Sequence, residues 1–333
     1  MTSREEQGGA GPGRRRRGSP GEPPYDRAVP PRSPLPPQDG LNAVWLRTPD
    51  RGREAVAWTT MGEWLRWRLP EKVDVSGMFT AERFVDDDGT PVADAAPYRP
   101  HTFVWFYRDL REEAPVPGAL HLLHRDERLV VVDKPAFLAT IPRGRHVRES
   151  VVVRLRDQLG LPELSPAHRL DRITSGVLVL TTERRWRGPY QMLFQRREAR
   201  KTYRALAPLD PALTLPTTVS NHLVKRRGLF QVEVVADAPP NAITRVVLEG
   251  RHGEHGVYRL EPATGRTHQL RAHLHGLGIP IVGDPVYPEV LDVALDDFRH
   301  PLQLLASELA FTDPVDGTDR VYASRRALPL HAE

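Results

Sequence analysis

The apolar positions after residue 119 fall into short runs that are typical of β-strands. "LVVVDKP" (129–135) is a continuous apolar run that stops at a proline, and "GVLVLTT" (176–182) is a second such run. Both predict buried strands. Further strands are predicted at 201–208, 230–235, 243–249 and 256–262.

Helical patterns are interspersed with these strands. Residues 150–160 read as a helix that ends at Gly160, and residues 183–197 as another. In 267–278, three leucines (Leu270, Leu274 and Leu277) share one helical face and predict its core side. Many strands with short connections and a few helices predict an α+β fold, in which helices pack on a mixed, largely antiparallel sheet.

A smaller unit is predicted before this region, over residues 41–115. "WLRWRL" (64–69) reads as a short helix that Pro70 ends, Asp88-Gly89 as the turn of a hairpin, and 101–108 as a strand. Prolines and a glycine at 115–118 mark a boundary. The main domain is therefore expected to cover residues 119–333.

Residues 1–40 have a different composition. They hold nine prolines and seven glycines, with an arginine block at 14–17. Such a stretch buries too little apolar surface to offset its ordering entropy, so we expect a disordered basic tail. It lacks the apolar core of a secretory signal. No run in the chain is long and apolar enough to span a membrane.

Composition narrows the chemistry. The 333-residue chain contains no cysteine, which excludes disulfides, cysteine zinc sites and thiolate mechanisms. Its formal net charge is +4, and nearly all of its cations are arginines. Arginine suits phosphate contacts and base stacking, although a codon bias toward arginine explains the same composition.

Two kinds of site receive little support. The chain has no glycine-rich loop that ends in Gly-Lys-Ser/Thr, and "GLGIPIVG" does not have the dinucleotide-binding spacing, so we expect no nucleotide cofactor. His268, His273 and His275 are clustered. On a helix, His273 would point away from the other two, so hydrogen-bonded or surface histidines explain the cluster better than a metal site does.

"PAHRLDRITSG" (166–176) places Asp171 between Arg169 and Arg172, at the start of an apolar run. Neighbouring cations favour the ionised carboxylate, and an ionised carboxylate can act as a nucleophile. Taken alone, these residues are explained better by a structural salt bridge at the start of a strand.

Four blocks together resemble the RluA-type pseudouridine synthases, in the same order and at similar spacing. They are "VVDKP", "HRLDRITSGVLVL", "RKTYRA" (200–205) and "EPATGRTHQLRAHLHGLGIPIVGDPVY" (261–287), and the resemblance extends over residues 119–312. It implies a pseudouridine synthase-like catalytic domain that turns a uridine of RNA into pseudouridine without cofactor or metal. Residues 63–108 resemble the small RNA-binding module that often precedes this domain. "FLATIPRGRHVRES" (137–150) departs from the usual family sequence at this position, where a histidine followed by glycines is common, and leaves the identity of the substrate open.

The resemblance also implies roles for individual residues. Asp171 matches the catalytic aspartate and Arg271 the arginine that pairs with it. Tyr203 matches an active-site tyrosine whose ring can stack on uracil and whose hydroxyl is a candidate proton acceptor. We expect the stem of Arg271 to be packed and its guanidinium to point toward Asp171, which would be left unpaired without it. Substrate-binding residues are expected at Arg169, whose counterpart fills the space of a flipped base, and at His168, Arg172, Lys201, Arg266 and His268.

The sequence thus predicts a cytoplasmic, cofactor-free RNA pseudouridine synthase that acts on structured ribosomal or transfer RNA. A monomer without a membrane partner is expected, although nothing in the sequence determines the oligomeric state. A non-catalytic RNA-binding or ribosome-assembly protein with the same fold is the first alternative, and a metal-dependent hydrolase built on the histidines is the second.

Overall fold

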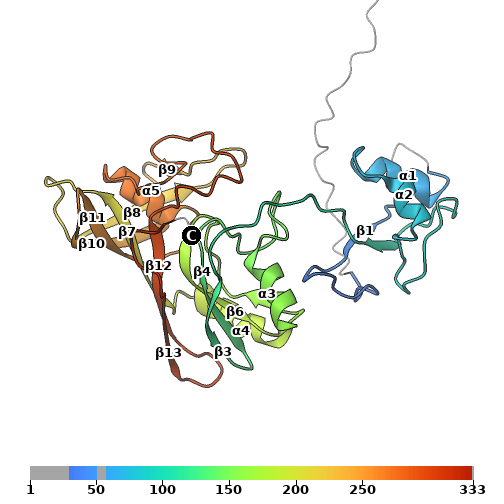
Figure 1. The fold of residues 1–333 in the computed structure, drawn as a ribbon, viewed down its shortest axis with the longest axis horizontal. Coiled ribbons are helices and arrows are strands. Elements are labelled where there is room, and N and C mark those ends of the chain that lie inside the picture. Colours follow the sequence, from blue (N-terminus) through green and yellow to red (C-terminus); the bar gives the residue numbers. More distant parts are fainter. Residues whose placement is uncertain (1–29, 51–57, 332–333) are drawn as a thin grey trace, which may run out of the picture. The chain divides into compact units, whose positions relative to one another are not determined.

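The computed structural model describes residues 30–50 and 58–331, which form two compact units (Figure 1). The first comprises residues 30–36 and 43–107, and the second comprises residues 37–42 and 108–331. Residues 108–118 belong to the second unit because the Glu113 carboxylate accepts hydrogen bonds from the backbone of residues 147–149. The division therefore falls at residue 107, before the prolines that marked the predicted boundary.

The first unit packs two helices on a two-stranded sheet. The elements are β1 (Val44–Arg47), α1 (Met61–Arg68), α2 (Val75–Thr80) and β2 (Phe103–Phe106). Helix α1 begins at Thr60, whose side chain forms a capping box with Glu63, and it ends just before Pro70, as predicted. The predicted turn forms at Gly89, whose φ is 79°, but its arms are reduced to a single bridge between Val85 and Pro91.

One sheet of eleven strands organises the second unit. Its strands are β3 (His121–Arg125), β4 (Leu129–Lys134), β5 (Ser165–Pro166), β6 (Ser175–Thr181), β7 (Arg200–Pro208), β8 (Thr217–Val224), β9 (Glu233–Val235), β10 (Ala242–His252), β11 (His255–Pro262), β12 (Leu304–Thr312) and β13 (Asp319–Ala323). The main order is β3-β4-β6-β12-β7-β11-β10-β8-β9, with β13 paired to β12 and β5 to β6. Only β6 and β12 run parallel among these pairs, so the predicted mixed, largely antiparallel α+β fold is confirmed.

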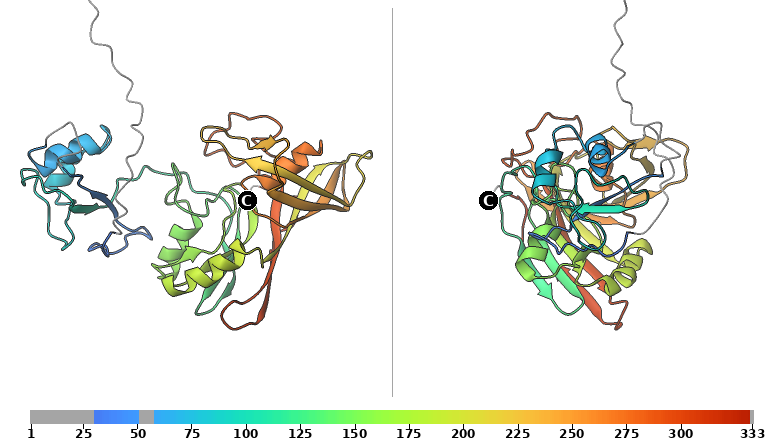
Figure 2. Two further views of the ribbon diagram at one scale, coloured as in Figure 1. Left: turned by 180° about the vertical axis from the view of Figure 1, so that it is seen from behind. Right: turned by 90° about the vertical axis from the view of Figure 1, so that its right-hand side faces the viewer.

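Helices cover both faces of this sheet. Helices α3 (Val151–Leu159) and α5 (Gln269–Gly276) pack on one face with Val130 and Val132 of β4, whereas α4 (Arg184–Gln195) packs on the other with Leu129 and Val131. Because both faces are covered, β4 and β6 are buried at every position, which explains their continuous apolar runs. Figure 2 shows the β10–β11 hairpin and the β12–β13 pair extending from this layered centre.

Most predicted elements are present. The three helices of the second unit and the strands predicted at 129–135, 176–182, 201–208, 230–235, 243–249 and 256–262 all form, with shifted ends. Leu270 and Leu274 face the core as predicted. Strands β1, β3, β5, β8, β12 and β13 and helix α2 were not predicted.

The predicted disordered tail falls mainly on residues 1–29, which lie outside the described residues. Its last part, residues 30–40, is described and makes contacts with both units. Leu35 packs against the Val85–Trp105 cluster of the first unit, and the Tyr107 hydroxyl donates a hydrogen bond to the Pro36 carbonyl. In the second unit, Gly40 has a φ of 71° and lies so close to Val153 that a Cβ would meet its carbonyl at 2.3 Å. Apolar and backbone contacts therefore offset the ordering entropy of this segment.

Candidate active site

A cleft of about 860 Å³ lies in the second unit, where the predicted motifs meet. Its walls come from the loop before β6, from α4, from β7 and from the segment that leads into α5. Eight of the nine predicted site residues line it, namely His168, Arg169, Asp171, Lys201, Tyr203, Arg266, His268 and Arg271. The exception is Arg172, whose guanidinium lies 5.7 Å from the centre of the Phe137 ring.

The backbone around Asp171 is held from several sides. The Thr140 hydroxyl donates to the carbonyl of Leu170 at 2.7 Å, and the fully buried Lys134 ammonium donates to the carbonyl of Arg172 at 3.0 Å. Leu170 itself is buried in the core. The Asp171 carboxylate is left 38% exposed, so this loop presents it to the cleft while its neighbours anchor the chain.

Gly176 of the "TSG" sequence explains how the loop enters the sheet. Its φ is 111°, and a Cβ there would lie 2.2 Å from the carbonyl oxygen of Ala306. Only glycine allows β12 to approach this closely. The parallel β6–β12 pairing of Gly176 with Ala306 therefore depends on this residue.

Arg271 connects two aspartates. Its side chain is 2% exposed, and its Nη1 lies 3.7 Å from Asp171 Oδ2, so its packed stem and its direction are as expected. Its principal partner, however, is Asp284, which accepts hydrogen bonds from Nε at 2.7 Å and Nη2 at 2.6 Å. Burial works against the charge, but the hydrogen bonds and charge of Asp284 outweigh it and raise the pKa of Arg271.

Asp284 was missed by the sequence analysis, although it lies in the quoted "GDPVY". Its side chain is fully buried, and its Oδ1 also accepts the backbone N–H groups of Val286 and Tyr287 at 2.8 and 3.1 Å. Removal of Arg271 would therefore leave two carboxylates without this partner, and Asp284 is the more deeply buried of the two. The sequence signal for it is an aspartate that directly follows the apolar run "GIPIVG" (278–283), where a turn is expected.

The Arg169 and Arg172 side chains do not pair with Asp171. Within the described residues, the cations within 4 Å of its carboxylate are Arg271 and, at 3.9 Å and only if protonated, His268. Arg169 is exposed at the cleft, and Arg172 is turned toward Phe137. The expected pairing of the adjacent arginines with Asp171 is therefore wrong, since the guanidinium beside this carboxylate belongs to a residue 100 positions away.

Tyr203 lies on the central strand β7, opposite Leu260 on one side and Ala306 on the other. The prediction of a strand is confirmed, and the ring borders the cleft. Burial, and then the nearby Asp171 carboxylate, raise the pKa of its phenol. The hydroxyl therefore carries its proton at neutral pH and can donate a hydrogen bond, but it is a poor proton acceptor.

His168, His268 and His273 each have a lowered pKa and a hydrogen-bond partner of their own. Burial lowers the pKa of His168 to about 3, and its Nε2 accepts the backbone N–H of Val179 at 3.2 Å. Burial also lowers the pKa of His273 to about 4, and its Nε2 lies 3.0 Å from the Asn221 amide oxygen. For His268, burial and then the charge of Arg271 lower the pKa to about 4. Residues 30–50 and 58–331 contain no group of three side chains arranged to hold a metal.

The cleft is electropositive. Asp171 supplies its only carboxylate among the described lining residues, whereas Arg169, Arg197, Lys201 and Arg266 supply cations around it. Lys201 points its ammonium toward the carbonyl of Thr264 at 3.4 Å, and burial lowers its pKa. Gln191, Phe194, Gln195 and Arg197 also line the cleft and were not predicted. No sequence motif marks them.

A carboxylate presented in an electropositive cleft, beside a tyrosine ring on a mixed sheet, is suited to chemistry on a polyanion such as nucleic acid. Comparisons with known proteins agree. The family model for RNA pseudouridylate synthase matches residues 128–276. The dual-specificity RNA pseudouridine synthase RluA of Yersinia pestis is 32% identical over 213 residues, which are 59% of this chain and 94% of that protein.

Two further relatives extend this result. The ribosomal large subunit pseudouridine synthase D of Pseudomonas aeruginosa is 28% identical over 215 residues, covering 60% of this chain and 66% of that protein. The structure of human RNA Pseudouridylate Synthase Domain Containing 1 has the same fold, with a TM-score of 0.51 and 24% identity over 65% of this chain and 86% of that one.

The chain therefore belongs to the RluA-type RNA pseudouridine synthase family. It is an isomerase that converts uridine in RNA to pseudouridine, as predicted, and none of the comparisons favours the non-catalytic alternative. In the described part of the chain, no helix has the length and apolar character needed to cross a membrane.

Proposed function

We propose that Asp171 is the catalytic carboxylate of this isomerisation. The observation that carries the proposal is its position: it lies in the cleft, 3.7 Å from an Arg271 guanidinium that Asp284 holds in place. The reaction breaks the bond between the uracil N1 and the sugar C1′, turns the base and joins C5 to C1′; C5 loses its hydrogen as a proton and N1 gains a proton, so the product is an isomer of the substrate. An anion beside the sugar serves this step either by adding to C1′ or by assisting formation of a glycal.

Tyr203 and Arg271 support this carboxylate in the proposal. The Tyr203 ring offers a face on which the detached uracil can stack, while its protonated hydroxyl acts as a hydrogen-bond donor. Arg271 places its guanidinium 3.7 Å from the carboxylate. A uridine stacked in RNA cannot reach Asp171, so it must first leave the stack, and the exposed Arg169 is placed to fill the vacated space.

The substrate is proposed to be structured RNA, either ribosomal or transfer. The names of the relatives support this, since one is a dual-specificity RNA enzyme and another acts on the ribosomal large subunit. Arg197, Lys201 and Arg266 line the cleft as candidate phosphate contacts. The first unit is proposed as an additional RNA-binding module, and the protein as a cytoplasmic monomer.

Mapping pseudouridines in total RNA from cells with and without the gene tests the substrate. We expect one or a few sites to disappear without it and to return with the wild-type gene but not with Asp171→Asn. Purified Asp171→Asn should bind RNA within about tenfold of the wild type, because phosphate contacts dominate affinity. Asp319→Asn, on the exposed strand β13, is the matched control and should retain turnover. Turnover by pure Asp171→Asn would contradict the assignment.

A further inference from the structure

A cluster of exposed aliphatic side chains lies in the segment that connects the "GDPVY" turn to β12. Val290, Leu291, Val293 and Leu295 are 48%, 50%, 44% and 40% exposed. They account for four of the fourteen large hydrophobic side chains that are exposed in the described residues, although they span only six positions. Single exposed apolar residues are ordinary, whereas a contiguous group of them marks an interaction surface.

The segment is fixed at both ends. At its start, the carbonyl of Pro288 accepts a hydrogen bond from Gln231 Nε2 at 2.8 Å. At its end, Phe298 packs against the main core of the unit, with its ring centre 5.3 Å from that of Phe137. Between these points, residues 289–297 form neither helix nor strand. The four aliphatic side chains are therefore carried on a stretch of backbone that is held at both ends, while they remain in contact with water.

The charge around these side chains is negative. Residues 289–297 contain four carboxylates and no lysine or arginine. Asp297 pairs with Arg299 at 2.6 Å. Among the described residues, the carboxylates of Glu289, Asp292 and Asp296 have neither an ion-pair nor a hydrogen-bond partner. Residues 289–297, which we call the acidic loop, thus combine exposed apolar area with three uncommitted negative charges.

Three occupants fit the acidic loop poorly. RNA is repelled by its carboxylates, and none of its residues lines the cleft. A two-fold dimer centred on the loop would bring the same carboxylates of the two copies together. The chain's own arginine block carries the right charge, but residues 11–21 contain only arginine, glycine, serine and proline, so they offer no aliphatic side chain to cover the exposed ones. A fitting partner brings cations and apolar side chains together.

We propose that the acidic loop docks a basic, apolar segment of another protein. Apolar side chains of that segment cover the four exposed aliphatic residues, and its lysine or arginine side chains pair with the three uncommitted carboxylates. Proteins that bind RNA carry such basic segments, because phosphate contacts dominate their affinity. Since the acidic loop lies outside the cleft, a protein that shares the RNA substrate can hold the enzyme without blocking the cleft.

Fluorescence polarisation of a labelled peptide with the full chain tests this surface. The peptide contains arginine, leucine and serine, and a matched peptide has serine in place of each leucine. We expect the leucine peptide to bind more tightly. Leu291→Ser should raise its Kd by about 5- to 10-fold, because half of the side chain is available for burial. Asp292→Asn combined with Asp296→Asn should raise its Kd by about 2- to 30-fold and weaken its dependence on salt.

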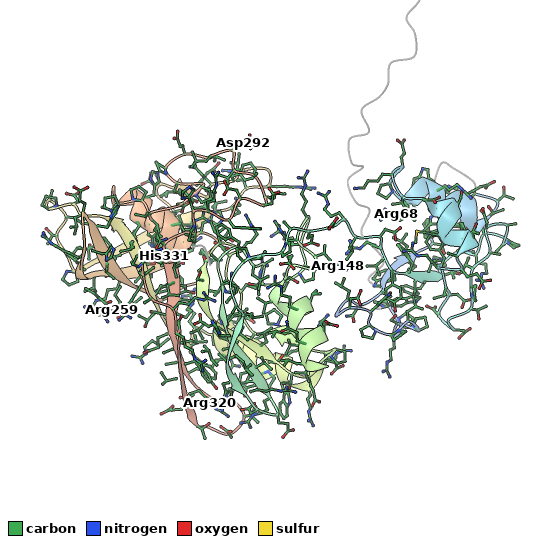
Figure 3. The ribbon with its side chains drawn as sticks, viewed as in Figure 1. Arg68, Arg148, Arg259, Asp292, Arg320 and His331 are labelled. Atoms are coloured by element: carbon green, nitrogen blue, oxygen red, sulfur yellow. The ribbon has the colours of Figure 1, made fainter. Side chains whose placement is uncertain are left out.

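Two exposed residues elsewhere in the unit provide matched controls. Val321→Ser changes an exposed apolar side chain next to Arg320, which Figure 3 shows at the opposite end of the unit from Asp292. Glu254→Gln neutralises an exposed carboxylate at the tip of the β10–β11 hairpin. Both variants should bind the peptide as the wild type does. Melting points confirm that every variant is folded.

Four results would overturn the proposal. The acidic loop is not a docking surface if Leu291→Ser matches Val321→Ser, and the double variant matches Glu254→Gln, in peptide affinity. Equal affinity for the two peptides would reduce the effect to general charge attraction. A dimer in sedimentation that Leu291→Ser dissociates would make the occupant a second copy of the chain. A labelled RNA stem–loop should bind the wild type and Leu291→Ser equally, and weaker binding by the variant would assign the loop to the RNA interface.

Discussion

Replacing Arg271 by methionine tests which carboxylate depends on its charge. Methionine keeps most of the packing volume but leaves Asp284, whose side chain is fully buried, with only backbone N–H donors. Removing one member of a buried ion pair costs about 3–5 kcal/mol. Asp171 is 38% exposed and 3.7 Å from Arg271, and a screened pair of that kind contributes about 0–1 kcal/mol. The loss of stability should therefore come from Asp284.

Two double variants separate these contributions. In Arg271→Met with Asp284→Asn, the amide oxygen can still accept the Val286 and Tyr287 N–H groups without a buried charge, so most of the lost stability should return. In Arg271→Met with Asp171→Asn, Asp284 stays unpaired and little should return. Urea unfolding gives the free energies of unfolding of the wild type, of Arg271→Met and of the two double variants. Rescue by Asp171→Asn but not by Asp284→Asn would refute this assignment of the buried pair.

The same pair should affect catalysis through position. Without Asp284, the Arg271 guanidinium loses the two hydrogen bonds that hold it beside Asp171. A displacement of about 1 Å of a catalytic group can cost about 100-fold in rate, so we expect Asp284→Asn to lower kcat by about that factor. RNA affinity should change much less, because Asp284 does not line the cleft. A parallel loss of affinity would indicate general unfolding instead.

Three further predictions concern other parts of the molecule. Tyr203→Phe keeps the stacking ring and Tyr203→Ala removes it, so alanine should be the more damaging change in single-turnover assays; equal activity would mean that the ring does not face uracil. His273 has a pKa of about 4 in the folded protein, below the ordinary histidine value, so the unfolded chain takes up its proton first. The contribution of neutral His273 to the free energy of unfolding should therefore be fully present above about pH 6.5 and be lost as the pH falls toward 4. The melting temperature should fall less over this range in His273→Gln than in the wild type, and equal falls would exclude this contribution. Deletion of residues 1–40 should lower the melting temperature relative to deletion of residues 1–29, because it removes Leu35 from its cluster. Identical melting curves would show that this contact does not contribute to stability.

Local patterns determined much of this protein from the sequence alone. Apolar runs identified β4 and β6 because burial on both faces leaves no polar position. Glycines and prolines identified the ends of α1 and α3 because they act on their immediate neighbours. The quoted motifs also placed Asp171, Tyr203 and Arg271 in one cleft.

Pairing between distant segments was decided only by the tertiary structure. Strands β8 and β12 have mixed polar and apolar positions, and they form because β10, β6 and β7 supply their partners. Arg172 is adjacent to Asp171 in sequence but turns toward Phe137, whereas Arg271 reaches Asp171 across the fold. Which cation meets a carboxylate depends on where the backbone directs each side chain, and the sheet pairings that set those directions join residues far apart in the chain. For the same reason, Asp284 meets Arg271 only because α5 and the turn after it pack together.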